Sequence, residues 1–187
     1  MRVYFLGAHS TGKTTLCRYV SEKYNLPFIN EMARTVLSEK ELSLDILRTD
    51  LETVDTYQGE VITRQMTEET KYKSFVSDRC FDGLAYAAQH ARILNSVIHT
   101  DLIKNYVEKL RDPDVFLFFV RPSKATMKQD GVRETLVWDG VVAIDAMVKL
   151  LLEMWGLDYF QISMDNMQER VRFIDSILKK YQEVKAD

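Results

Sequence analysis

Apolar residues gather along the chain in short runs that alternate with longer amphipathic stretches. Most of these runs are continuous, which is typical of strands buried on both faces of a parallel sheet. Five runs predict strands at residues 3–6, 28–29, 75–77, 115–120 and 159–162. Between them, apolar residues recur every three to four positions, as on one face of a helix. These helical stretches are 16–24, 44–65, 84–94, 102–110, 141–155 and 171–181.

The alternation of strands with helices predicts an α/β fold built on a doubly wound parallel sheet. No Gly/Ser-rich or Pro-rich linker and no internal repeat interrupts the pattern, so we expect a single domain over residues 1–187. Ligands of such sheets bind beyond the carboxyl ends of the strands. The residues that follow each predicted strand are therefore the candidates for chemistry.

Composition narrows the class of protein. Hydrophobic residues make up 46% of the 187 residues and charged residues 28%, as in an ordinary globular domain. The net charge of −3 argues against binding nucleic acid through bulk positive charge. Cys17 and Cys80 form neither a disulfide framework nor a zinc quartet. We expect a cytoplasmic protein without a signal peptide or a membrane partner, since no apolar run is long enough to cross a bilayer.

The first predicted strand leads into a glycine-containing loop that matches G-x-x-x-x-G-K-[ST], between a strand and a helix as this phosphate-binding motif requires. Its glycines let successive amide groups point inward as an anion nest, and the following helix adds its positive dipole end. The lysine supplies a mobile charge for the β- and γ-phosphates, and the next threonine a hydroxyl for Mg²⁺. The predicted cofactor-binding residues are Gly7, Ala8, His9, Ser10, Thr11, Gly12, Lys13, Thr14 and Thr15.

Two charged residues follow the second predicted strand. Glu31 stands at its carboxyl end and Arg34 one helical turn later, so both side chains can project from one helix face. The carboxylate can accept the proton of an acceptor hydroxyl, and the arginine can clamp a phosphate or hold the carboxylate. A surface ion pair near a helix start is the alternative. Beside a phosphate loop we favour the catalytic interpretation.

The third predicted strand runs out into Asp78, Arg79, Cys80 and Asp82. An acid that closes a buried strand beside a phosphate loop is a second anchor for Mg²⁺, which assigns Asp78 to the metal together with Thr14. Arg79 would neutralise charge on the transferred phosphoryl group. Asp82 is either an N-terminal helix cap or a contact to substrate. Cys80 has no histidine near it in sequence, so we expect a reduced thiol without nucleophilic chemistry.

A basic segment follows the fourth predicted strand. We expect residues 121–138 to form a lid that closes over a nucleotide and excludes water, with Arg133 as its functional cation. For Lys124 and Lys128, a lid role and an ordinary solvated loop are equally open. Arg121 begins this segment at the strand end.

The helical region from about residue 40 to 73 would form one wall of an acceptor pocket. Tyr57 can stack on the face of a planar base. Taken singly, each polar residue here is more often a surface or core position of a helix, and their clustering is what favours a binding role. The candidate substrate contacts are Asp55, Tyr57, Gln58, Arg64 and Gln65.

Over residues 1–163 the chain resembles the P-loop nucleoside and nucleotide kinase superfamily, above all its branch with the ribosylnicotinamide kinase domain of bacterial NAD regulators and the phage-type small kinases. The resemblance is carried by Gly7–Thr14, Glu31-x-x-Arg34, Asp78-Arg79 with Asp82, and Asp130-Gly131-Val132-Arg133. It implies a three-layer sandwich around a five-stranded parallel sheet of order 2-3-1-4-5, with a helical substrate region and a lid.

The same resemblance implies roles for individual residues. In the deoxynucleoside kinases of that superfamily an E-x-x-R motif supplies the base and its partner, and Glu31 and Arg34 match it. An acid-Arg-Ser motif at the third strand is matched by Asp78 and Arg79, with a cysteine in place of the serine. Arg133 would be the lid arginine, while lysines fill part of the usual multi-arginine pattern.

The leading hypothesis is a phosphotransferase that moves the γ-phosphoryl group of ATP, bound with Mg²⁺, to a nucleoside or nucleotide. Lys13 and the loop amides would hold ATP, and Glu31 would orient the acceptor. The cations expected to converge on a basic cleft with Lys13 are Arg34, Arg79 and Arg133. A kinase for a hydroxymethylated pyrimidine in DNA, suggested by phage relatives of the fold and requiring a flipped base, is the first alternative. An NTPase switch without an acceptor is the second, and the oligomeric state is left open.

Overall fold

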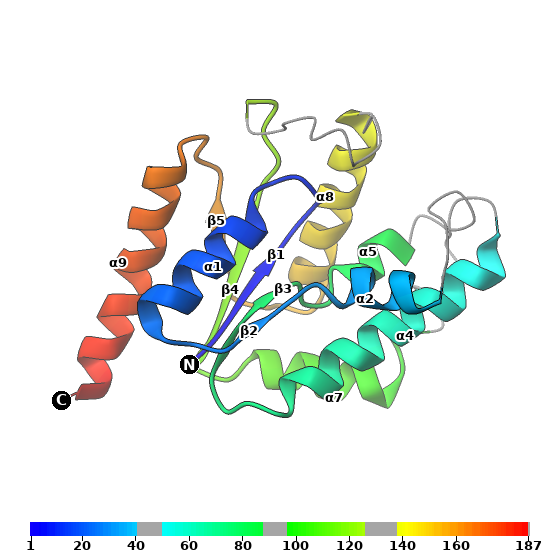
Figure 1. The fold of residues 1–187 in the computed structure, drawn as a ribbon, viewed down its shortest axis with the longest axis horizontal. Coiled ribbons are helices and arrows are strands. Elements are labelled where there is room, and N and C mark those ends of the chain that lie inside the picture. The colour runs from blue at the N-terminus through cyan, green and yellow to red at the C-terminus, as the bar shows by residue number, and fades with distance from the viewer. Residues whose placement is uncertain (41–49, 88–96, 126–137, 187) are drawn as a thin grey trace.

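The computed structural model describes residues 1–40, 50–87, 97–125 and 138–186, whose helices and strands form three layers (Figure 1). The strands are β1 (Arg2–Leu6), β2 (Phe28–Ile29), β3 (Phe75–Asp78), β4 (Val115–Val120) and β5 (Phe160–Ile162). The helices are α1 (Lys13–Tyr24), α2 (Met32–Glu39), α4 (Leu51–Glu69), α5 (Gly83–Ala87), α7 (Asp101–Leu110), α8 (Trp138–Met154) and α9 (Met167–Ala186).

The five strands form one parallel sheet in the order β2-β3-β1-β4-β5, which confirms the predicted topology. β1 is the central strand, with Phe5 opposite Asp78 on one side and Phe118 on the other. Because all strands run the same way, their carboxyl ends meet at one edge of the sheet. The loop that leaves β1 therefore starts in the middle of that edge, between the ends of β3 and β4.

Helices cover both faces of the sheet. On one face, Val3 and Phe5 of β1 pack with apolar residues of α1 and α9. On the other face, Tyr4 and Leu6 pack with α5, α7 and α8, and Figure 1 shows these two layers on opposite sides of the strands. Successive side chains of a strand point to opposite faces, so the continuous apolar runs in the sequence reflect a sheet that is buried on both sides.

The predicted helices correspond to helices of the structure with shifted ends. The predicted stretch 44–65 falls on α4 (Leu51–Glu69), and its first residues belong to 41–49, outside the described residues. The stretch 84–94 begins as α5, and residues 88–96 lie outside the described part. The helix α2 was not among the predicted stretches. Of the predicted lid, residues 126–137 also lie outside the described ranges.

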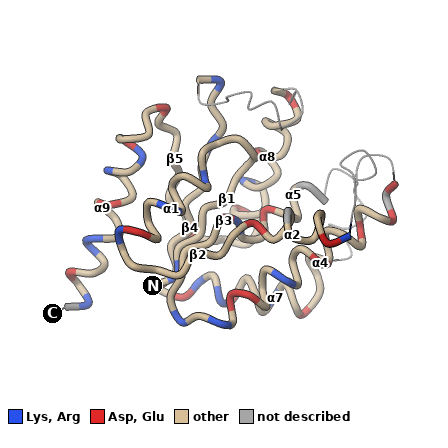
Figure 2. The backbone as a smooth tube through the Cα atoms, viewed as in Figure 1, with Lys and Arg blue, Asp and Glu red and all other residues tan. Residues whose placement is uncertain are grey.

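Charges of both signs are interspersed along the outer helices, as α7 and α9 show in Figure 2. Some form ion pairs one helical turn apart, such as Lys104 with Asp101 on α7, and exposed pairs of this kind contribute little to stability. Over the described ranges, no helix combines the length and the apolar character needed to span a bilayer.

Candidate functional site

The loop between β1 and α1 has an unusual backbone. Gly7, Ser10 and Gly12 have positive φ values of 133°, 58° and 90°, a region that residues with side chains rarely enter. A Cβ on Gly7 would lie 2.5 Å from the carbonyl oxygen of Val120 at the end of β4. The loop therefore lies directly against the sheet, and its first position requires glycine both for the backbone angle and for this close approach.

Lys13, the first residue of α1, is only 5% exposed. Its Nζ donates a hydrogen bond to the Ala8 carbonyl oxygen at 2.6 Å and lies 3.4 Å from the Thr11 hydroxyl. Burial, together with the charge of Arg79, lowers the pKa of Lys13 to about 8. A desolvated cation of this kind gains from a nearby anion. Among the other predicted loop residues, exposure ranges from buried Ala8 and Thr11, through half-buried His9, Ser10, Gly12 and Thr14, to exposed Thr15.

Thr14 and Asp78 face each other across the start of α1 and the end of β3. The Thr14 hydroxyl donates to Asp78 Oδ2 at 2.5 Å, and Asp78 is 3% exposed. A hydroxyl and a carboxylate are the hard oxygen donors that Mg²⁺ prefers, and this ion usually takes the rest of its shell from phosphates and water. The two predicted metal ligands are thus adjacent. Within the described ranges, no three His, Cys, Asp or Glu residues gather into an all-protein metal site.

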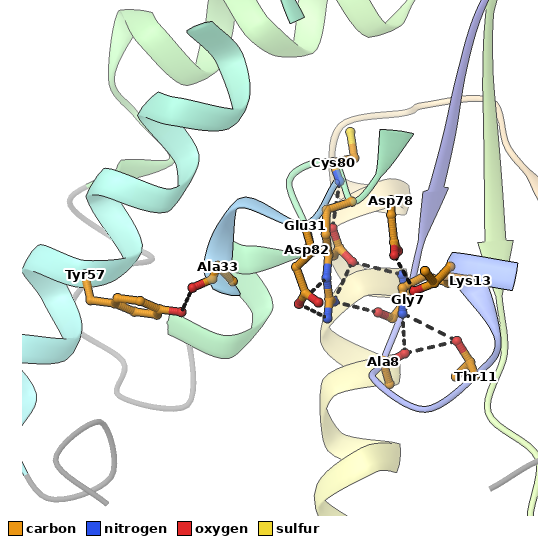
Figure 3. A network of polar contacts seen from close by, with 12 residues as sticks. Gly7, Ala8, Thr11, Lys13, Glu31, Ala33, Tyr57, Asp78, Cys80 and Asp82 are labelled. Atoms are coloured by element: carbon orange, nitrogen blue, oxygen red, sulfur yellow. Dashed lines mark hydrogen bonds and ion pairs between the residues drawn. The ribbon is translucent and has the colours of Figure 1, made fainter. Parts of the chain in front are cut away.

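Arg79 connects the ends of three strands. Its Nε and Nη2 donate to Glu31 Oε1 at 3.1 and 2.7 Å, and its Nη1 donates to the Gly7 carbonyl at 3.2 Å and to Asp82 Oδ2 at 3.0 Å. The backbone of Arg79 has a φ of 134°, a strained conformation that persists where surrounding contacts hold it. The guanidinium therefore joins the phosphate loop to the carboxylate after β2, and Figure 3 shows its partners Gly7, Glu31 and Asp82 close together.

Asp82 is fully buried behind the phosphate loop. Its Oδ1 accepts from the Cys80 amide at 2.8 Å, and its Oδ2 accepts from the Gly7 amide at 3.2 Å. The sequence left a helix cap and a substrate contact open for this residue. In the structure its carboxylate is instead bonded to the loop and to Arg79, so it fixes the position of both.

Glu31 and Arg34 were predicted to face one cleft. Glu31 lies at the start of α2, and its carboxylate pairs with Arg79, which follows β3. Arg34 belongs to α2, but its side chain lies outside the described part, as does the predicted lid residue Arg133. At this edge Lys13 and Arg79 come together with three carboxylates. These carboxylates belong to Glu31, Asp78 and Asp82.

Two of the predicted substrate contacts on α4 are buried and bonded within the protein. Tyr57 is 6% exposed and packs against α2. Its hydroxyl donates a hydrogen bond to the Ala33 carbonyl at 2.8 Å, away from the cluster around Gly7 (Figure 3). Gln65 is 3% exposed and donates to Ser77 Oγ at 2.8 Å. The side-chain oxygen of Gln58 faces Gly83 at the start of α5, 3.6 Å from where a Cβ on Gly83 would lie.

The base of the predicted lid is anchored to α8. Arg121, which follows β4, holds the buried carboxylate of Asp145 with Nε–Oδ distances of 3.0 and 2.8 Å and an Nη2–Oδ2 distance of 2.6 Å. Lys124 lies over the ring of Trp138, 5.2 Å from its centroid. Lys128 belongs to the residues outside the described ranges.

Two features near the site were not predicted. Glu69 on α4 accepts hydrogen bonds from Tyr4, Tyr106 and Gln65 at 2.8–2.9 Å, and burial raises the pKa of its carboxyl. Arg170 on α9 is fully buried and donates to the Thr11 carbonyl of the phosphate loop at 2.6 Å. A basic residue in the first turn of a helix, where the dipole disfavours it, is the one sequence signal that could have pointed to Arg170.

The loop, the parallel sheet and the two helical layers together define a P-loop kinase fold, and solved structures share it. Deoxyadenosine kinase from M. mycoides, with dCMP and dCDP bound, has a TM-score of 0.66 at 14% identity, covering 96% of this chain and 100% of that one. Shikimate kinase from Acinetobacter baumannii, in complex with shikimate, has a TM-score of 0.56 at 14% identity, covering 100% and 95%. NadR protein in complex with NAD and AMP-PNP has a TM-score of 0.63 at 18% identity, covering 95% and 48%.

The family is given by sequence. Residues 2–170 match the AAA domain family, and the chain belongs to that family. No curated protein sequence matches it. At these identities the solved structures establish the fold, a P-loop kinase fold that this chain shares with deoxyadenosine kinase, shikimate kinase and NadR protein.

Proposed function

We propose that this chain is a phosphotransferase that moves the γ-phosphoryl group of ATP to a nucleoside or nucleotide. The observation that carries the proposal is the pairing of Glu31 with Arg79, whose guanidinium also contacts the phosphate loop. A carboxylate held beside a phosphate site is what transfer to a hydroxyl needs, because it can take the hydroxyl proton and orient the oxygen. We also propose that residues 1–187 act as one domain, since α9 contacts the loop.

The donor side consists of Lys13, the loop amides and Arg79. Lys13 would move its ammonium group from the Ala8 carbonyl to the β- and γ-phosphates. Their negative charge would compensate for the water that the buried ammonium group has lost. Arg79 would stabilise charge on the transferred group without large movement, which is the main task of a protein in phosphoryl transfer. Asp82 keeps the Gly7 amide and Arg79 in place for this.

The donor set of Thr14 and Asp78 fits Mg²⁺. When bound, this ion neutralises charge on the β- and γ-phosphate oxygens. The protein residues would contribute the hydroxyl of Thr14 and the carboxylate of Asp78, which the start of α1 and the end of β3 already hold together.

The acceptor side would lie near Glu31 and Gln58. A nucleoside or nucleotide acceptor is supported by the solved deoxyadenosine kinase, which holds dCMP and dCDP on the same fold. If the acceptor is a monophosphate, Glu31 has no proton to remove, and Arg34 would instead clamp the phosphate. Either way, the reacting oxygen would approach the γ-phosphate from the side of α2.

A panel of acceptors with γ-labelled ATP tests the proposal. Nucleosides, nucleoside monophosphates, DNA with hydroxymethylated pyrimidines and a sample without acceptor would be compared. Label transfer to a nucleoside or monophosphate supports the proposal. Transfer to modified DNA alone would favour the DNA kinase, and fast ATP hydrolysis without acceptor would favour an NTPase switch.

Glu31→Gln tests the catalytic assignment. For a hydroxyl acceptor we expect kcat to fall by about 10²-fold or more while KM changes little, which is the size of a general-base contribution. Glu22→Gln is the matched control, because Glu22 is an exposed residue of α1 away from the site. Near-normal turnover of Glu31→Gln would remove Glu31 as the base.

A further inference from the structure

The first turn of α9 lies against the phosphate loop. A Cβ on Gly12 would come within 3.2 Å of Met167 Cε and 3.5 Å of Arg170 Nη1. Arg170 Nη1 donates to the Thr11 carbonyl at 2.6 Å, and Nε donates to the Met164 carbonyl at 2.5 Å. A helix from the end of the described chain thus supports the turn at which α1 begins.

The surroundings of Arg170 are unfavourable for a cation. Its side chain is fully buried, and its Nη2 has no hydrogen-bond partner. Within the described ranges no carboxylate lies within ion-pair distance of Arg170. Asp165 is the acid that interacts with it electrostatically, and burial lowers the pKa of the guanidinium. Its position in the first turn of α9 places it at the positive end of a helix dipole. A buried charge with so little compensation is costly unless a ligand supplies the missing anion.

The bond to Thr11 also orients the loop. In a planar trans peptide the C=O and N–H groups point in opposite directions. A hydrogen bond from Arg170 to the Thr11 carbonyl therefore directs the Gly12 amide away from Arg170. Gly12 is the residue before α1 and has a positive φ of 90°, so this peptide could turn over if nothing held it.

We propose that Arg170 is a positioning residue of the donor-phosphate site, which fixes the Thr11–Gly12 peptide and adds a buried positive charge behind the anion nest. This role rests on the proposed function for its ligand, a nucleoside triphosphate. It differs from the roles of Lys13 and Arg79, because Arg170 acts through the loop backbone and not by touching the phosphates.

A positioning role of Arg170 predicts different effects on donor binding and on acceptor binding. Loss of Arg170 should weaken the binding of any triphosphate, whether or not it carries a nucleobase. The loop amides are then no longer held toward the anion, and the positive charge behind them is gone. It should leave acceptor affinity unchanged, since Arg170 lies on the α1–α9 side of the sheet. If Arg170 were only structural, its substitution would lower stability and would affect donor and acceptor binding alike.

Calorimetric titration with inorganic tripolyphosphate and with ATP tests the proposal. For Arg170→Met we expect the dissociation constants for both to rise about tenfold or more, the effect of losing a charged hydrogen bond. Arg170→Lys keeps the charge but loses the forked geometry, so we expect a smaller rise. Arg172→Met, at an exposed position two residues along α9, removes the same charge and should bind like the wild type. Circular dichroism checks that each variant is folded.

The outcomes separate this inference from the proposed function. Unchanged tripolyphosphate affinity in folded Arg170→Met, or in Arg170→Lys if the first variant does not fold, overturns the positioning role. An equal rise in the acceptor KM also overturns it. If the wild type transfers no phosphoryl group, yet its tripolyphosphate affinity falls in Arg170→Met, the proposed function fails and this inference stands.

Discussion

The lowered pKa of Lys13 makes triphosphate binding depend on pH. An anion beside the ammonium group favours its charged form, so binding raises a pKa that is about 8 in the free protein. The contribution of Lys13 to binding is therefore fully present below pH 8 and is lost as the pH rises through that value. From pH 7 to pH 9, the protonated share of a group with this pKa falls about tenfold. Measured relative to Lys13→Met, which corrects for the ionisation of the ligand itself, the dissociation constant for tripolyphosphate should rise by the same factor.

Calorimetric titration across this pH range, in buffers of different ionisation enthalpy, measures both the affinity and the proton uptake. Lys13→Met should bind weakly and keep only the pH dependence of the ligand, whose last proton also dissociates in this range, whereas Lys179→Met, at an exposed position on α9, should keep the wild-type profile. The wild type should take up close to one proton per ligand more than Lys13→Met at pH 9. Equal pH profiles and equal proton uptake in the wild type and Lys13→Met would refute the reasoning.

Three other substitutions probe contacts around the site. Gly7→Ala should abolish tripolyphosphate binding, because its Cβ would lie 2.5 Å from a β4 carbonyl; near-normal binding by a folded variant in calorimetry contradicts this. Arg121→Met should lower the free energy of unfolding by about 2 kcal/mol at pH 7, since it leaves the buried Asp145 carboxylate without the Arg121 hydrogen bonds. The loss should shrink at pH 5, because burial raises the pKa of Asp145 and protonation relieves the charge; urea unfolding that gives equal losses at both pH values counts against the argument. Tyr106→Phe should cost about 1.5 kcal/mol by removing a donor to Glu69, and an unchanged urea midpoint would show that this bond contributes nothing.

Much of the fold could be predicted because a parallel sheet buries its strands on both faces. β4 is six apolar residues, and its predicted ends at Val115 and Val120 are those of the structure. Helix boundaries were less predictable. α1 begins at Lys13, three residues before the apolar stripe. Its first turn consists of polar residues of the phosphate-binding motif, which carry no apolar signal. α2 is only eight residues long, too short for its apolar spacing to establish a helical period.

The site was predictable where chemistry is local in sequence. The loop, Lys13 and the Thr14–Asp78 pair lie where strand ends place them. The pairing of Glu31 with Arg79 was not predictable, because it depends on how α2 packs beside β3. Burial of Tyr57 likewise depends on the contact between two helices. The roles of these residues stay predictions, and the assays above test them.

The bond between Arg170 and the Thr11 carbonyl spans 159 positions of the chain. During synthesis the phosphate loop emerges before its supporting arginine, so the growing chain carries an incomplete anion site until Arg170 has been added. Contacts between such distant residues also form late in refolding, because a long loop must close first. Recovery of full tripolyphosphate affinity would therefore report completion of the described fold, and chains without the Arg170 contact would bind nucleotide about tenfold more weakly.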